Sequence, residues 1–175
     1  MAVNRSTSKK EILNQLVSLF WTVLCFTPLL WFWIKEVINI YFYISLAFSL
    51  LIGILPDRIL KRFFLSSSVR FYEKLGVKRI RKFVQNGDIV NAITDKQKNA
   101  SIKGRLQAQQ YLKTIAMYER FHWICFTFFL LTAINCFLKG YVKLGVAVTA
   151  ANLIYNLGSI LLQQYNSIRI KRITG

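Results

Sequence analysis

The sequence is poor in acidic residues, in proline and in histidine. Its 175 residues include 7 Asp and Glu against 24 Lys and Arg, two prolines and one histidine, which gives a net charge of +17. Yet 54% of the chain is hydrophobic and 15% is aromatic. A disordered chain is not this apolar, and a water-soluble domain rarely needs so much apolar material. A strongly basic chain binds nucleic acid or an anionic lipid surface, and the placement of the charges decides between these partners.

Cysteine is scarce as well. Cys25, Cys125 and Cys136 all fall within uncharged stretches and show neither a disulfide framework nor the spacing of metal ligands. We interpret them as buried structural thiols. With one histidine, the chain also cannot form the paired Glu-x-x-His motifs of di-iron helical bundles, so no metal site is predicted.

Charged residues are missing from four long runs, at residues 12–34, 37–55, 121–138 and 144–168. About 20 residues of helix cross a hydrocarbon core roughly 30 Å thick, so each run is long enough to span a membrane. The sequence therefore predicts an all-α integral membrane protein that forms a single membrane domain over residues 1–175. Its predicted spans are residues 12–34, which we interpret as a retained signal anchor, 37–55, 121–138 and 144–162.

The basic residues lie almost entirely on one side of these spans. Four spans place both termini and the segment 56–120 on the same face, and 21 of the 24 Lys and Arg fall there. The positive-inside rule then predicts that this face is cytoplasmic, in a multi-pass protein of the cytoplasmic (bacterial inner) membrane.

The segment 56–120 is predicted to be basic and amphipathic. Apolar residues recur at helical spacing opposite the cations, which is typical of helices lying on a membrane surface. The partners predicted for it are anionic inner-leaflet headgroups, and nucleic acid is not expected. A sharper alternative is a site for the phosphates of a nucleotide-bearing substrate, formed by Lys78, Arg79, Arg81 and Lys82. A turn is predicted at residues 86–88 and a polar loop at residues 95–104.

Glu119 and His122 are the first candidates for chemistry. They are spaced i and i+3 on a helix that is predicted to run into the third span, on its apolar, bundle-facing side. Ionisable groups are costly there, which marks them as functional candidates. His122 would act as general base on a hydroxyl, while Glu119 would fix its tautomer or take a proton. The alternative is a structural pair that pins the helix.

A polar stripe follows the fourth run at alternating steps of four and three residues. This spacing predicts one face of a continuous helix, which would line a pocket for a polar headgroup or, alternatively, hold helices together. The stripe comprises Gly145, Thr149, Asn152, Asn156, Ser159, Gln163 and Asn166.

Several motifs resemble the glycosyl-4,4'-diaponeurosporenoate acyltransferase family over roughly residues 70–170. They are Arg70-Phe71-Tyr72-Glu73-Lys74-Leu75-Gly76-Val77, Asn86-Gly87-Asp88, Glu119-Arg120-Phe121-His122-Trp123 and the tail from Asn156 to Arg169. The tail includes Gln163-Gln164-Tyr165-Asn166-Ser167-Ile168-Arg169, which resembles a Gln-Arg-Tyr-Asn-Arg-Pro-Arg pattern. This chain has Gln164 and Ser167 where that pattern has arginines, and Gly158 where a proline is expected.

The resemblance implies an enzyme that esterifies a sugar hydroxyl of a glycosylated carotenoid, or a similar glycolipid acceptor, with a fatty acyl group. It implies Glu119 and His122 as the catalytic pair, and a substrate site that also includes Asn156, Gln163, Tyr165, Asn166 and Arg169. No bound cofactor is expected. The acyl group would come from acyl-coenzyme A or an acyl carrier protein on the cytoplasmic side. The alternative function is a non-catalytic scaffold that binds anionic lipid and another membrane protein.

Overall fold

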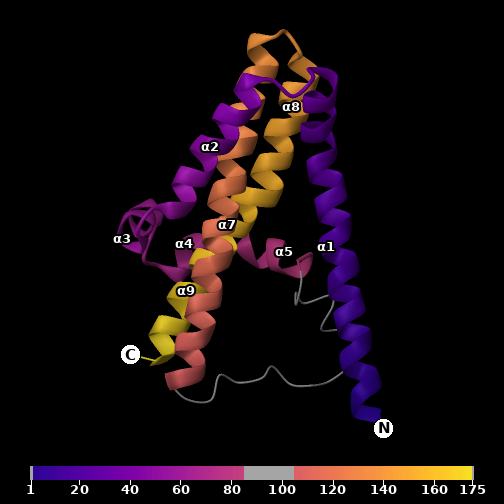
Figure 1. Ribbon diagram of the computed structural model, residues 1–175. Helices are drawn as coiled ribbons and strands as arrows, with labels where there is room; N and C mark the ends of the chain where they lie inside the picture. Colours follow the sequence, from indigo (N-terminus) through magenta and orange to yellow (C-terminus); the bar gives the residue numbers. More distant parts are fainter. Residues whose placement is uncertain (1, 85–104, 175) are drawn as a thin grey trace.

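Long helices dominate the architecture. The computed structural model describes residues 2–84 and 105–174, and every element among them is helical (Figure 1). The first long helix is α1 (Ala2–Lys35) and the second is α7 (Arg105–Leu138). The third is continuous from α8 (Val142–Ala151) through the π-helix η2 (Asn152–Leu157) into α9 (Gly158–Thr174). The turn predicted at residues 86–88 and the loop predicted at 95–104 lie outside the described residues.

Three helical segments are long and apolar enough to cross a membrane, namely Lys9–Lys35, Arg105–Leu138 and Val142–Arg172. The predicted span at residues 37–55 differs. Its helix, α2 (Ile40–Ile54), has 15 residues, about 22 Å of helix, which is shorter than a hydrocarbon core of about 30 Å. The chain then bends by 96° into α3 (Asp57–Leu60) and η1 (Lys61–Phe63). The described residues thus hold three candidate spans, or four if this bent pair is counted as one.

The side chain of Arg120 closes the end of α2. Its Nη1 donates to the carbonyl oxygens of Gly53 at 2.5 Å and Leu55 at 2.7 Å, and its Nη2 pairs with Asp57 at the start of α3. Pro56 has no N–H with which to continue the helix, and the last carbonyls of any helix lack intrahelical partners. Arg120 supplies those partners from α7, so α2 ends and turns at this point without leaving them unsatisfied.

The main core joins α1, α7 and α8. Leu29, Phe32 and Trp33 of α1 are buried against Phe129 of α7 and Val148 of α8. Cys25 and Cys136 are buried in the same core, and the three cysteines are free of disulfides. The indole Nε1 of Trp33 donates to Thr132 Oγ1 at 3.0 Å, because a buried indole requires an acceptor.

The segment after the bend packs on α9. Tyr72 of α4 (Val69–Lys74) and Val77 of α5 (Val77–Lys82) are fully buried against Leu162 and Tyr165 of α9. The prediction that the apolar side of this segment faces lipid therefore needs correction at these positions, because α9 covers it. Other apolar residues of the segment, including Phe63, Leu65 and Phe83, are exposed.

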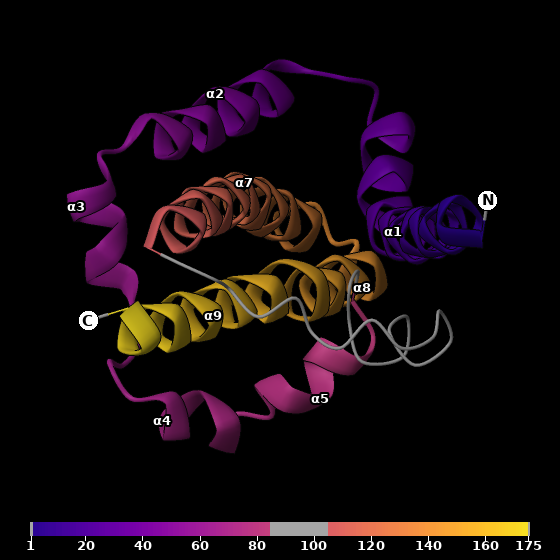
Figure 2. The same cartoon turned by 90° about the horizontal axis from the view of Figure 1, so that it is seen from below.

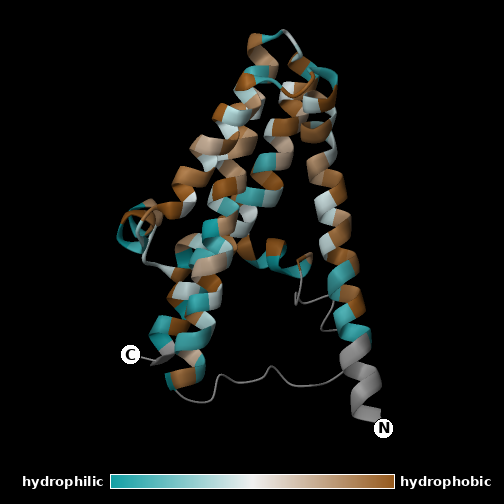
Figure 3. Ribbon diagram, viewed as in Figure 1, coloured by the Kyte–Doolittle hydropathy of each residue, from teal (hydrophilic) through white to brown (hydrophobic). Residues whose placement is uncertain are grey.

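The outer surface of the long helices is apolar. Large apolar side chains are exposed along these helices, and such a surface is typical of contact with lipid. Examples are Leu19, Trp31, Phe48, Leu130 and Ile154. Figure 2 shows α7 and the α8–α9 helix at the centre, with α2 and α3 on one side and α4 and α5 on the other. Hydrophilic residues gather toward the end of the molecule where both termini lie (Figure 3). These features define an all-helical membrane protein.

Candidate active site

His122 is held by a pair of asparagines from η2. The imidazole Nδ1 lies 3.3 Å from Asn156 Oδ1, and Asn156 Nδ2 donates to Asn152 Oδ1 at 2.9 Å. Asn152 Nδ2 in turn donates to the carbonyl oxygen of Phe126 at 3.0 Å. Asn156 is 0% exposed and Asn152 is 3% exposed, so this chain of hydrogen bonds lies inside the bundle.

The direction of these hydrogen bonds fixes the imidazole tautomer. A backbone carbonyl can only accept a hydrogen bond, so Phe126 requires the amide nitrogen of Asn152 to face it. The Asn152 oxygen then faces Asn156, whose nitrogen must donate and whose oxygen therefore faces His122. Nδ1 must consequently carry a proton in the neutral ring, which leaves Nε2 unprotonated. An unprotonated Nε2 is the form that accepts a proton from a substrate hydroxyl.

Glu119 has a different set of partners. Its carboxylate, with the residue only 6% exposed, accepts a hydrogen bond from Gln164 Nε2 at 3.0 Å. Gln164 Oε1 accepts from the Tyr72 hydroxyl at 2.9 Å, and that hydroxyl also meets the carbonyl oxygen of Ser66 at 3.1 Å. Burial raises the pKa of the Tyr72 phenol, so this group is a neutral donor. These contacts connect Glu119 on α7 through α9 to α4.

The structure therefore places Glu119 and His122 on one buried side of α7, as predicted from their spacing, but gives each its own partner. Asn156 performs the tautomer-fixing role that was expected of Glu119. Gln164, which contacts Glu119, is not on the helix face that the spacing predicts, and it stands where the family pattern has an arginine.

The π-helix explains why Gln164, and not Gln163, faces inward. Its i→i+5 hydrogen bonds place one more residue in a turn than an α-helix does. Beyond η2 the inward face therefore moves by about one position relative to a continuous helix. Gln164 and Ser167 are buried at 1% and 6% exposure, whereas the predicted positions Gln163 and Asn166 are only half-buried.

The other predicted site residues lie at three separate places. Ser159 is half-buried on α9, while Tyr165 and Arg169 belong to the contact between α4 and α9. The Tyr165 hydroxyl lies 3.3 Å from Glu73 Oε1, and the Arg169 guanidinium lies 5.4 Å from the Tyr165 ring. The basic residues Lys78, Arg79, Arg81 and Lys82 all lie on α5, where Lys78 pairs with Glu73 at 3.0 Å.

Trp123 adds an unusual donor to the site. Its indole Nε1 is buried one helical turn beyond Glu119 and acts as a hydrogen-bond donor toward that carboxylate, although no contact of this nitrogen among the described residues reaches the geometry of a well-formed hydrogen bond. Buried donors are almost always paired, and the Glu119 carboxylate is the acceptor on which this donor acts.

This arrangement is that of a helical membrane protein that holds one ionisable imidazole, in a fixed tautomer, inside the helical bundle. The family follows from comparison with known proteins. The family model for glycosyl-4,4'-diaponeurosporenoate acyltransferase matches residues 56–175, well over half of the chain, and the chain belongs to this family. Searches of curated proteins and of solved structures found no match.

Proposed function

We propose that this protein is a membrane acyltransferase that moves a fatty acyl group from a cytoplasmic thioester donor to a hydroxyl of a glycosylated carotenoid or a similar glycolipid. The observation that carries the proposal is the chain from His122 through Asn156 and Asn152 to the Phe126 carbonyl, in a member of an acyltransferase family.

His122 performs the proton transfers. Its Nε2 takes the proton of the acceptor hydroxyl as the hydroxyl oxygen attacks the thioester carbonyl carbon. The tetrahedral intermediate then collapses, the carbon–sulfur bond breaks, and the imidazolium returns the proton to the departing thiolate. These reaction steps form no covalent acyl-enzyme intermediate, so a single general base is sufficient.

Glu119 binds the acceptor in this scheme, and Trp123 orients the Glu119 carboxylate. A carboxylate accepts hydrogen bonds, and sugar hydroxyls donate them, so Glu119 holds a hydroxyl adjacent to the one that reacts. Nε1 of Trp123 donates toward the same carboxylate and holds it in place for the bound sugar.

The small stabilisation that hydrogen bonds between membrane helices provide favours a functional role for the His122 network over a purely structural one. Such bonds contribute only about 0.6 kcal/mol on average within membranes. The network built on His122 places one imidazole and two amides inside the bundle for that modest gain. The scaffold alternative required the polar stripe to face another protein, whereas Asn152 and Asn156 are buried and paired within this chain.

The topology proposed for this function has both termini and the segment 56–120 in the cytoplasm. The two described termini lie at the same end of the long helices (Figure 1), and 21 of the 24 Lys and Arg fall in the two terminal segments and in residues 56–120. A donor carrying coenzyme A or a carrier protein would approach from this side, while the lipid acceptor would enter from the bilayer.

The test is untargeted lipid mass spectrometry of cells that lack the protein, express it, or express His122→Ala at matched abundance. We expect a lipid heavier by one fatty acyl group only in cells with the unaltered protein. Identical lipid profiles in the three strains would contradict the proposal, and so would a normal amount of product with His122→Ala.

A further inference from the structure

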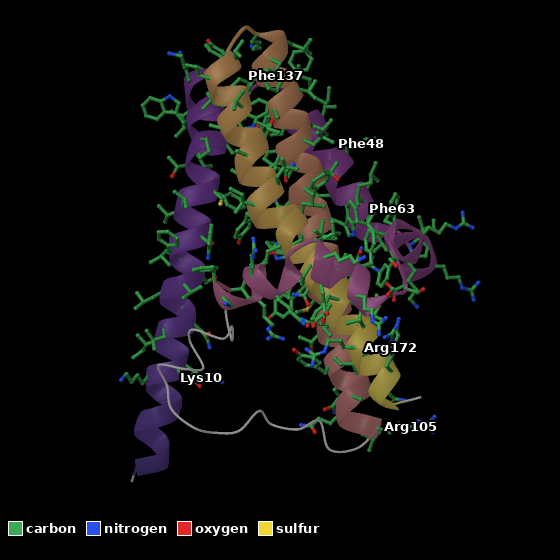
Figure 4. All side chains as sticks on the ribbon, turned by 180° about the vertical axis from the view of Figure 1, so that it is seen from behind. Lys10, Phe48, Phe63, Arg105, Phe137 and Arg172 are labelled. Carbon is green, nitrogen blue, oxygen red and sulfur yellow. The ribbon has the colours of Figure 1, made fainter. Side chains whose placement is uncertain are left out.

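A second site lies at the end of the molecule where α9 meets the segment after η1. An open pocket of about 570 Å³ is lined by Lys61 of η1, by Phe64, Ser66 and Ser67 of the segment that follows it, and by Ile168, Lys171 and Arg172 of α9. Figure 4 shows Phe63 and Arg172 on the same side of the molecule, with the Arg105 end of α7 below them.

The lining of this pocket is cationic. Lys61, Lys171 and Arg172 contribute three positive charges, and none of its lining residues is acidic. Of the carboxylates on neighbouring elements, Asp57 pairs with Arg120 and Glu73 pairs with Lys78, while the buried Glu119 attracts Lys171 without lining the pocket. The three cations therefore face the pocket without a carboxylate in its wall.

Two of the pocket cations contact uncharged groups. Arg172 Nη2 donates to the Ser67 carbonyl at 3.4 Å, a long bond that uses one of five guanidinium donors. The Lys171 ammonium lies 5.8 Å from the Phe64 ring centre. Ser66 Oγ accepts from the Ser68 amide at 3.0 Å, so its hydroxyl proton remains available for donation.

We propose that this pocket binds a phosphate or pyrophosphate group through Lys61, Lys171, Arg172 and the hydroxyls of Ser66 and Ser67. Converging ammonium, guanidinium and hydroxyl donors are the groups that recognise phosphate oxygens. The phosphate comes either from a nucleotide-bearing thioester or from the headgroup of an anionic phospholipid. Its assignment to the acyl donor rests on the proposed function, whereas phosphate binding itself does not.

The wall of the pocket continues into the network around Glu119. The Ser66 amide donates to the Tyr72 hydroxyl at 3.3 Å, and the Ser66 carbonyl lies 3.1 Å from the same hydroxyl. Tyr72 contacts Gln164, which contacts Glu119. A phosphate bound here is therefore anchored on the same short segment that positions the buried carboxylate, as a donor anchored beside its reaction site requires.

This location differs from the one predicted on α5. There Lys78 is already paired with Glu73, and Lys82 lines a separate apolar cavity with Leu13, Leu16 and Phe20. The three cations of the α9 pocket instead line one cavity together with hydroxyl donors.

The test measures binding of coenzyme A to the full-length protein in nanodiscs of phosphatidylcholine, a lipid without net charge. The ligand control is pantetheine, which carries no phosphate. The pocket variant is Lys61→Gln/Lys171→Gln/Arg172→Gln. Its matched control, Arg58→Gln/Arg62→Gln/Lys74→Gln, removes three exposed cations that do not line the pocket. A third variant replaces Lys78, Arg79, Arg81 and Lys82 with Gln. A parallel arm compares how many phosphatidylglycerol molecules each variant retains in mixed nanodiscs.

We expect the pocket variant alone to lose roughly tenfold or more in affinity for coenzyme A, or to lose its retained phosphatidylglycerol. The first result identifies the phosphate as the donor's and the second as a headgroup's. The charge-conserving Lys61→Arg/Lys171→Arg variant should retain binding. Equal losses in the pocket and control variants, a loss confined to the α5 variant, or binding unchanged in all would overturn the phosphate site. None of these results depends on acyl transfer, so the proposed function is tested separately.

Discussion

The Nδ1 of His122 lies 3.3 Å from Oδ1 of Asn156, 34 residues further along the chain. This contact joins α7 to the π-helix η2. It makes an asparagine, not the neighbouring Glu119, the residue that orients the imidazole. Since the amide is uncharged, it fixes which nitrogen carries the proton without adding a second buried charge.

Asn152→Ala, Asn156→Ala and the double variant should each lower acyl transfer by roughly a hundredfold, the lower end of the range for general-base catalysis. The effects should not add, because both asparagines act through the same imidazole. Transfer is measured by product formation at matched protein abundance. Thr149→Ala is the control, since Thr149 Oγ1 donates to the Gly145 carbonyl of its own helix. Multiplicative losses in the double variant would contradict a shared route.

Gln164→Leu should lower the free energy of unfolding by about 1–3 kcal/mol, because it leaves the buried Glu119 carboxylate and the Tyr72 hydroxyl without their shared partner. Gln163→Leu, at the adjacent half-buried position, should change it by less than about 0.5 kcal/mol. Unfolding in detergent measures both. The reverse order would show that the helix keeps its α register through residues 152–157.

Arg120→Ala should destabilise the protein by about 1.5–3 kcal/mol, since the carbonyls of Gly53 and Leu55 lose a charged donor. Asp57→Asn should cost less than about 1 kcal/mol, because the Asp57 side chain is 61% exposed and exposed ion pairs contribute little. Unfolding curves of the two variants distinguish closure of α2 from simple charge pairing. Equal effects would contradict the former.

The hydrogen bond from Lys78, assisted by one from Tyr165, lowers the pKa of the Glu73 carboxyl. A carboxyl whose pKa is lowered on folding stabilises the folded state above its unfolded pKa, about 4.3, and this contribution is lost as the pH falls through the folded value. The unfolding midpoints of the unaltered protein and Glu73→Gln should therefore differ at neutral pH and converge in acid. A difference that does not vary with pH would exclude this contribution.

The sequence predicts the long helices well, because uncharged runs of membrane length have few alternatives. The third is confirmed as part of one helix, Arg105–Leu138, and the inward side of Glu119 follows from its spacing. The second run is not a straight span. Its Pro56 is visible in the sequence, but the side chain that closes α2 comes from Arg120, 64 residues beyond that proline, and such a contact has no local signal.

The site was harder to predict than the helices. A helical wheel assumes a constant number of residues per turn, so it selects Gln163 and Asn166 after a π-helix that it does not include. Asn152 is the first residue of η2 and Asn156 lies within it, before the full change of register, so the helical spacing selects both. Gln164 and the pocket between Lys61 and Lys171 depend on how α9 meets the segment after α2, which pairwise spacing along one helix does not reveal.

The central claim is that the asparagine pair holds a proton on Nδ1 of His122 and leaves Nε2 free to accept one. The chain has one histidine, so NMR of protein carrying isotope-labelled histidine and a purification tag without histidine reports this ring alone. At a pH where the imidazole is neutral, the account predicts the Nδ1–H tautomer in the unaltered protein and a mixture in Asn156→Ala. An Nε2–H tautomer in the unaltered protein would contradict it.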